Sequence, residues 1–458
     1  MGSSQSKKQP PILTHCSIPA YCIKAVGSRH FIIAGGGGSA KTGVKNEIEL
    51  FLLSYNQFSK LGNQPLESRP NSSTSLLSRP TQVINTSKYA TMNMDVIPIA
   101  PLDQGKYLIA AGQDEFCYLY ETTGYGVKEE EAEVEVPSRL SLNFREITRI
   151  ITDTNAKDAY QKCVRFDRSG GEKPLRMATG GNDGYIRVWN VSEILQNRDP
   201  KVRKPIVEFL ADTESNLSDA VQDLDISLCG LYLASVAKEV NIWDLNLGKK
   251  ILKLPSVPQL GDGFKVRSLR FTPLDRSGRN AVFVVAYNQR TMSSKAISYL
   301  ALWTFNKEQK LCHLHSLKQT CTQSISSLSV SPCGKFTAIG TMGGSVGIFD
   351  TQNMQLLHLA QETHTNFVTA IDFLPSRTYD VKQGYLNSSE AVQKNSASCF
   401  LPGIISDQLT SVISLSVDQS IQVHSVPYPK SGSASGYLLK LAIWTLILYV
   451  IFWLLLKY

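Results

Sequence analysis

The sequence lacks paired cysteines of the kind that bind zinc or build a disulfide framework. Its nine cysteines are scattered singly from Cys16 to Cys399, without a CxxC pair. This spacing is typical of a protein in a reducing compartment. The seven histidines fit no metal-ligand spacing, and no acid–base pair stands out. We therefore expect no covalent chemistry and no required cofactor.

Charge is also sparse and evenly spread. Charged residues make up 19% of the chain, with 47 Lys and Arg against 39 Asp and Glu, a net charge of +8. So diffuse an excess suits an anionic lipid surface or an acidic partner and makes nucleic acid an unexpected ligand. The N-terminus, MGSSQSKKQPPILTH, lacks a continuous apolar segment, so no signal peptide is predicted and the bulk of the chain is expected in the cytosol.

One long apolar run lies at the C-terminal end. Residues 437–456 read YLLKLAIWTLILYVIFWLLL, without a charge after Lys440. About 20 such residues span the hydrocarbon core of a bilayer as an α-helix. The run predicts a single transmembrane helix, preceded by a flexible tether at 427–436 and followed by a lumenal tail at 457–458.

The rest of the chain is predicted to form repeats typical of WD-type propeller blades. The clearest unit is Tyr160–Val191, in which TGGNDG precedes a strand that ends at Trp189. We count seven units: Tyr21–Ser54, Met92–Glu121, Tyr160–Val191, Asp219–Leu245, Phe264–Phe305, Ser324–Asp350 and Phe367–Val426. The fold class is therefore all-β, a seven-bladed propeller over 12–426 followed by the transmembrane helix.

The seventh unit offers only three strands. The alternating segment Ile12–Ile18 is expected to complete it, which closes the ring and removes a sheet edge. Inserted loops are predicted at 62–88, 122–159 and 378–406. The acidic run at 129–135 is interpreted as part of a solvated loop.

A glycine-rich segment, GGGGSAKTGVKN at Gly35–Asn46, replaces an ordinary hairpin turn in the first unit. A Walker A loop needs Gly before Lys-Ser/Thr and then a helix, but Ala40 precedes Lys41 and a strand pattern follows. No dinucleotide-binding fingerprint fits either. Two interpretations stay open: a loose hairpin that needs glycine for positive φ, or a protruding loop that engages an ion or a partner's phosphate site.

This loop, the degenerate propeller and the C-terminal apolar run together resemble the prolactin regulatory element-binding protein family. The similarity spans nearly the whole chain and includes ATMN (Ala90–Asn93), AAGQD (Ala110–Asp114), TGGNDGYIRVW (Thr179–Trp189) and Gly340–Ile348. The glycine-rich loop is the most specific of these motifs, since generic WD propellers lack it. The family comprises exchange factors of the endoplasmic reticulum for the small GTPase that starts COPII coat assembly.

The resemblance implies a site and a location. In the family this loop binds a potassium ion and reaches towards the nucleotide site of the GTPase. The implied functional residues are Gly35, Gly36, Gly37, Gly38, Ser39, Lys41, Thr42, Gly43 and Asn46. The implied protein is a monomer, anchored once in the endoplasmic-reticulum membrane with its propeller in the cytosol.

Two other functions stay open: a membrane-tethered WD scaffold without exchange activity, and a DNA-binding regulator, which the family's name suggests. The regulator is disfavoured because no helix-turn-helix or zinc signature is present. The N-terminal tail, residues 1–11, also matches the motif M-G-x-x-x-[ST], which predicts a myristoyl group on Gly2.

Overall fold

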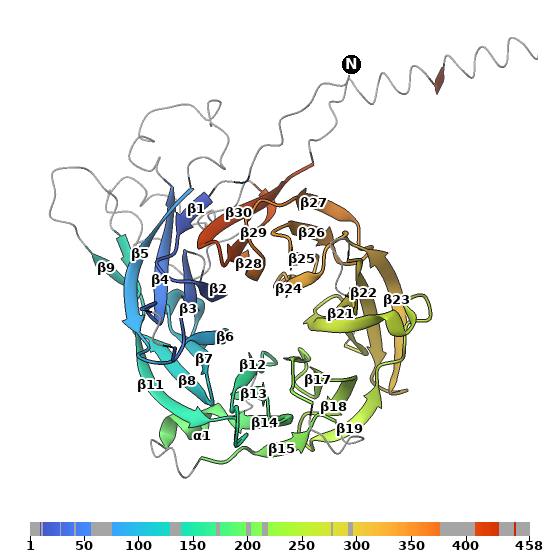
Figure 1. The fold of residues 1–458 in the computed structure, drawn as a ribbon, viewed down its shortest axis with the longest axis horizontal. Coiled ribbons are helices and arrows are strands. Elements are labelled where there is room, and N and C mark those ends of the chain that lie inside the picture. The colour runs from blue at the N-terminus through green and yellow to red at the C-terminus, as the bar shows by residue number, and fades with distance from the viewer. Residues whose placement is uncertain are drawn as a thin grey trace, which may run out of the picture. The chain divides into compact units, whose positions relative to one another are not determined.

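Four-stranded antiparallel sheets make up the fold. The computed structural model describes residues 10, 12–27, 29–40, 43–55, 76–128, 139–170, 175–197, 203–212, 219–275, 278–291, 296–375, 408–429 and 444–445. Seven sheets are arranged as blades around a centre in the unit Met1–Val426 (Figure 1). This confirms the predicted all-β, seven-bladed propeller.

The blades follow the order of the chain, and each runs from an inner to an outer strand. The first four are β2 (Ala20–Val26), β3 (His30–Gly35), β4 (Glu47–Tyr55), β5 (Leu76–Asn85); β6 (Thr91–Pro98), β7 (Tyr107–Gln113), β8 (Phe116–Thr122), β11 (Phe144–Ile151); β12 (Gln161–Phe166), β13 (Arg176–Gly181), β14 (Tyr185–Asn190), β15 (Val207–Leu210); and β16 (Asp223–Ile226), β17 (Tyr232–Val236), β18 (Val240–Asp244), β19 (Lys249–Lys253).

The last three blades are β20 (Phe264–Thr272), β21 (Asn280–Gln289), β22 (Ser298–Asn306), β23 (Leu311–Gln319); β24 (Ile325–Val330), β25 (Phe336–Thr341), β26 (Val346–Asp350), β27 (Leu356–Ala360); and β28 (Val368–Leu374), β29 (Gln408–Ser416), β30 (Ser420–Pro427), β1 (Ile12–His15). A short helix α1 (Val191–Gln196), two 3₁₀ turns, η3 (Leu102–Gln104) and η4 (Gly261–Gly263), and a hairpin of β9 (Gly126–Lys128) and β10 (Arg139–Ser141) lie in connections.

The apolar core is divided among the seven junctions between neighbouring blades, because both faces of each sheet meet a neighbour. One buried cluster, for example, joins Ile109 of blade 2 with side chains of blade 1 such as Leu50. Another joins Trp243 of blade 4 to Ala178 of blade 3. Burial of apolar surface at every junction, at about 25 cal/mol per Å², favours a closed ring over an open stack.

Strand β1 completes blade 7, as predicted. It pairs antiparallel with β30, so that His15 lies opposite Ser420. The strand ends at His15, earlier than the expected Ile18, but Cys16 and Ile18 are buried in the cluster between blades 7 and 1. The ring therefore closes through segments more than 400 residues apart.

This closure predicts a position-specific stability effect within β1. Leu13 packs against the core cluster between blades 7 and 1, whereas its neighbour Ile12 is exposed. We expect Leu13→Asp to lower the free energy of unfolding by about 2 kcal/mol, because a charge is placed on the core side of the strand. Ile12→Asp, the matched control, is expected to change it by less than about 0.5 kcal/mol. Denaturant titration measures both; equal losses would contradict this role of β1.

Two predicted loops contain strands. Residues 76–85, inside the expected loop 62–88, form the outer strand β5, and residues 144–151, inside 122–159, form the outer strand β11. Outer strands have one unpaired edge, and such an edge tolerates Pro80, which has no N–H to donate. Because proline is rare in strands, Pro80 makes the segment LLSRPTQVIN look like a loop in the sequence.

Several predictions lie outside the described residues. These are the Gly2 site and the tail except for Pro10, the acidic run at 129–135, the loop at 378–406, tether residues 430–436, the segment 437–456 except for Trp444 and Thr445, and the tail at 457–458. Within the described part of the chain, no helix has the length and apolar character needed to cross a membrane.

Candidate functional site

The glycine-rich loop connects β3 to β4 in blade 1, at the edge of the blade where the inner strand β2 begins. Its first two glycines are buried, and steric contact dictates both. A Cβ on Gly35 would overlap the carbonyl oxygen of Pro19, and one on Gly36 would overlap the side-chain oxygen of Asn46. Gly36 also has φ of 135° and donates its N–H to Pro19 O at 2.9 Å. The base of the loop is therefore closely packed.

The tip has a different character. Gly38 and Gly43 have φ of 71° and 79°, and a Cβ on either would meet no atom within 4 Å. Glycine is therefore needed at both positions for the positive φ, and the space next to each Cα is open. Gly37 and Gly38 are half-buried, whereas Ser39 and Gly43 are exposed. The side chains and backbone of Lys41 and Thr42 lie outside the described residues.

Asn46 fastens the loop to the propeller. Its side chain is 4% exposed, and its Oδ1 accepts from Gly38 N at 2.8 Å while its Nδ2 donates to Gly38 O at 3.0 Å. Nδ2 also donates to Ser87 O, at 3.0 Å, in the connection between β5 and β6. One buried amide thus holds the near side of the loop and ties it to the next blade. In this structure Asn46 is an anchor, and it presents no free side chain to a partner.

Acidic side chains lie close to this anchor on β4. Glu47 and Glu49 are both buried, and Ser17 Oγ lies 3.4 Å from Glu47 Oε2 and 2.7 Å from Glu49 Oε1. Burial raises the pKa of Glu49, and the hydrogen bond from Ser17 opposes that shift. Lys45 Nζ is 3.7 Å from Glu47 Oε1 but its side chain is largely exposed.

The side-chain oxygens near the anchor limit the kind of metal ion that could bind there. All are oxygens, which suit a hard cation such as K⁺ and disfavour transition metals. Across the described ranges, no cluster of three or more His, Cys, Asp or Glu residues is suited to a metal ion. Carbonyl, amide and hydroxyl oxygens, which the loop also carries, are ligands of the kind that K⁺ accepts. A potassium ion at this loop stays a prediction of the family resemblance.

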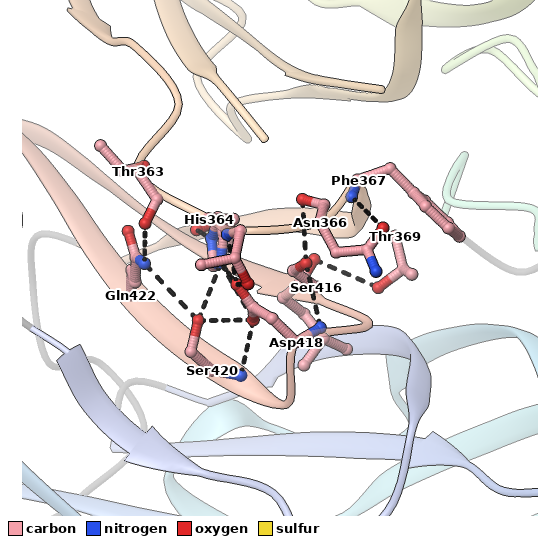
Figure 2. A network of polar contacts seen from close by, with 12 residues as sticks. Thr363, His364, Asn366, Phe367, Thr369, Ser416, Asp418, Ser420 and Gln422 are labelled. Carbon is pink, nitrogen blue, oxygen red and sulfur yellow. Dashed lines mark hydrogen bonds and ion pairs between the residues drawn. The ribbon is translucent and has the colours of Figure 1, made fainter. Parts of the chain in front are cut away.

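A second polar group, in blade 7, has the connectivity of a catalytic triad. His364 Nδ1 lies 3.3 Å from Asp418 Oδ2 and 2.9 Å from Ser420 Oγ (Figure 2). His364 Nε2 lies 2.7 Å from Ser414 Oγ. Ser414 and His364 are buried, however, and His424 Nε2 also contacts Ser414 Oγ at 2.9 Å. Such a buried network of hydrogen bonds is typical of a structural role in the blade.

The same structural role recurs in other blades. Trp189 donates to Thr179 Oγ1 at 2.9 Å in blade 3, and Trp243 donates to Ser235 Oγ at 2.9 Å in blade 4. His424 occupies the corresponding place in blade 7. Burial lowers the pKa of His424 well below its ordinary value, and the nearby His358 and His364 add to this shift. Its imidazole is therefore neutral and packs like an aromatic residue.

The inner strands line a central cavity of about 670 Å³. Carboxylates join neighbouring inner strands there by accepting a backbone N–H from the next blade: Asp95 from Phe166, Asp225 from Phe271 and Asp372 from Ala25 at 2.8–2.9 Å, and Asp223 from Leu269 at 3.2 Å. Inner strands of different blades share no sheet, so these hydrogen bonds fix the spacing between blades.

Cations alternate with these carboxylates. Lys24 Nζ lies between Asp95 and Asp372, at 4.0 and 3.8 Å, and Arg165 lies 3.9 Å from Asp225. Arg168 binds Asp95 with both guanidinium nitrogens, at 2.7 and 2.9 Å. The positive and negative charges therefore pair with one another, which is typical of a structural role. We call these residues the charged belt: Lys24, Asp95, Arg165, Arg168, Asp225 and Asp372.

Comparison with known proteins finds relatives along almost the whole chain. No protein-family model matches. The guanine nucleotide-exchange factor SEC12 of Rattus norvegicus is 25% identical over 453 residues, covering 92% of this chain and 91% of its own, and that of Mus musculus is 26% identical over 450 residues with the same coverage.

The chain is similar to SEC12 along almost its whole length. SEC12 is another name for the prolactin regulatory element-binding protein family, so the resemblance noted in the sequence is confirmed. SEC12-like protein 2 of Arabidopsis thaliana is 28% identical over 200 residues, or 43% of this chain and 44% of its own. The match to the two rodent SEC12 proteins extends far beyond any one blade or motif.

Solved structures agree on the fold alone. A chain in a structure of the COPII coat assembled on membranes aligns with a TM-score of 0.55 at 13% identity, over 91% of this chain and 48% of that chain. Sqt1 from Chaetomium thermophilum aligns with a TM-score of 0.51 at 13% identity, over 91% and 99%. Both likenesses support the propeller, whereas the similarity to SEC12 bears on function.

Proposed function

We propose that this chain is a guanine nucleotide exchange factor for the small GTPase that initiates COPII coat assembly. The observation that carries the proposal is the match, over 92% of the chain, to SEC12 proteins named as guanine nucleotide-exchange factors. The geometry supports it: a loop packed tightly at its base and open at its tip is suited to enter another protein's site.

The mechanism requires binding energy and no covalent step. Small GTPases hold guanine nucleotides chiefly through phosphates, Mg²⁺ and backbone amides. An exchange factor must bind the nucleotide-free GTPase more tightly than the loaded form, and about 10⁴-fold preference corresponds to roughly 5.5 kcal/mol. A loop anchored by Asn46 spends little of this energy on its own ordering, since two hydrogen bonds already hold Gly38.

The remaining parts of the proposal concern the cation and the membrane. When bound, a potassium ion supplies positive charge at the loop, where oxygen donors near Asn46 would hold it. Segment 437–456 is the proposed single membrane anchor, which keeps a monomeric propeller on the cytosolic face of the endoplasmic reticulum.

The direct test is release of fluorescent GDP. We expect the full chain in detergent to accelerate release from the COPII-initiating GTPase by at least 10³-fold, and to leave Ras unaffected. Membrane extraction before and after truncation at residue 436 tests the anchor. An unchanged release rate would favour a membrane-tethered scaffold, and retention of a DNA duplex at physiological salt would favour the regulator.

A further inference from the structure

An aromatic cluster bearing two cations lies at one edge of blade 2. Tyr89, in the connection that leads to β6, and Phe116, at the start of β8, contact one another edge to face, with ring centroids 5.8 Å apart. Arg149 on β11 lies over Phe116 at 4.8 Å, and its Nη1 donates to Tyr118 OH at 2.7 Å. Lys88 Nζ lies 4.8 Å from the Tyr89 ring. We call Lys88, Tyr89, Phe116, Tyr118 and Arg149 the blade 2 cluster.

Much of this cluster is available to solvent. Lys88 and Arg149 are exposed, Tyr89 and Phe116 are half-buried, and the neighbouring Ile151 is 50% exposed. Cation–aromatic contacts at exposed positions stabilise a fold by only about 0.5–1 kcal/mol. Stability alone is thus a weak reason to keep two aromatic rings and an isoleucine at the surface.

The cluster is continuous with the glycine-rich loop. Asn46 Nδ2 donates to Ser87 O, and Ser87 is the residue before Lys88. Thr86 N donates to Asn46 O at 2.9 Å, and Tyr89 N donates to Thr86 O at 3.3 Å. The connections β3–β4, β5–β6 and β7–β8 also emerge at the same edge of their blades, because the strands alternate in direction. The loop and the cluster therefore form one surface.

The chemistry of this surface is that of a protein-binding site. Tyrosine and arginine are enriched among residues that dominate binding energy, since they offer large apolar area together with hydrogen-bonding groups. Val44, 40% exposed beyond the loop tip, adds apolar surface on the blade 1 side. Asp114 and Glu115, in the turn between β7 and β8, border the cluster with negative charge near Lys88.

We propose that the blade 2 cluster is a docking surface for the same GTPase whose nucleotide the glycine-rich loop releases. The inference rests on the proposed exchange function and assigns separate roles to two parts of this surface. The cluster holds the GTPase, through an apolar segment that packs on Tyr89 and Phe116 and a carboxylate that pairs with Arg149. The loop then acts on the nucleotide site.

The test separates docking from release. The rate of fluorescent GDP release is measured against the concentration of the full chain, which gives a half-saturating concentration and a maximal rate. We expect Arg149→Gln and Tyr89→Ala each to raise the half-saturating concentration about tenfold with little change in maximal rate. Arg149→Lys, which keeps the charge, should recover part of the loss.

Arg145→Gln is the matched control. Arg145 lies on the same strand, with its side chain 73% exposed, and pairs weakly with Glu121 at 3.9 Å. It should leave both parameters unchanged. If Tyr89→Ala lowers the melting temperature, Arg149→Gln carries the test, since it alters an exposed side chain.

The outcomes are distinguishable. An active wild type with unchanged half-saturating concentrations in both variants overturns the docking surface and leaves the exchange function standing. A fall in maximal rate alone also overturns it, because the cluster would then act in release. An inactive wild type overturns the exchange function and, with it, this inference.

Discussion

Asn46→Ala is expected to lower the maximal rate of GDP release by about 100-fold. The substitution removes both hydrogen bonds that hold Gly38 and the one that ties the loop to Ser87. Displacing an acting group by about 1 Å can cost 10²-fold in rate, and we expect Gly38 to shift when these hydrogen bonds are lost. Because the amide is buried, stability should also fall, by about 1–3 kcal/mol.

Two further variants make this result specific to the loop. Asn46→Asp keeps an acceptor for Gly38 N–H but loses both donated hydrogen bonds, so its rate should lie between those of the wild type and the alanine variant. Asn306→Ala removes an asparagine whose Oδ1 also accepts two backbone N–H groups, those of Glu308 and Gln309, in blade 5. It should release GDP at the wild-type rate. A folded Asn46→Ala protein with full activity would show that loop geometry does not govern exchange.

Asp95→Asn should destabilise the ring by about 3 kcal/mol at pH 7. Asp95 is buried and pairs with Arg168 and Lys24, and removing one partner of a buried ion pair typically costs 3–5 kcal/mol. The exposed part of the Arg168 side chain places the expected loss at the lower end of this range. Urea titration measures it, with Glu121→Gln as the control, since the pair of Glu121 with the exposed Arg145 is 3.9 Å long and open to solvent.

The pH dependence of this loss has a defined sign. Burial would raise the pKa of Asp95, but Arg168, Lys24 and Arg165 together hold it below the ordinary value. A carboxylate with a lowered pKa stabilises the fold above its unfolded pKa of about 3.9, and this stabilisation is lost as the pH falls further. The wild type and the asparagine variant should therefore differ fully at pH 7 and converge below about pH 4. A difference that is constant with pH would show that packing, and not charge, causes the loss.

The sequence predicts the blades well because each unit repeats the same strand pattern and turn residues. It predicts outer strands poorly: β5 contains Pro80 and has an edge without a partner strand, so its pattern is weak. The ring closure by β1 was predictable because the seventh unit lacked a strand.

The candidate site was predictable only in part. Gly36 and Asn46 stand out by their place in an unusual loop, but the contact between Asn46 and Ser87 spans 41 residues and ends in a segment expected to be an insertion. The charged belt was missed altogether. A comparison of the units could have found it, because charged residues recur at one position of the inner strands. In each case the residue lies two positions after the first strand pair that follows a shift in register; these residues are Lys24, Asp95, Arg165 and Asp372.

The pairing of β1 with β30 also has a consequence for biosynthesis. The ribosome makes β1 first and its partner strand last, so β1 stays unpaired while six blades are completed. Contacts between residues so far apart in sequence form slowly, and an unpaired strand attracts other chains. The last junction can close only when residue 427 has been released, so chaperones that shield the nascent N-terminus should influence how much of this protein matures.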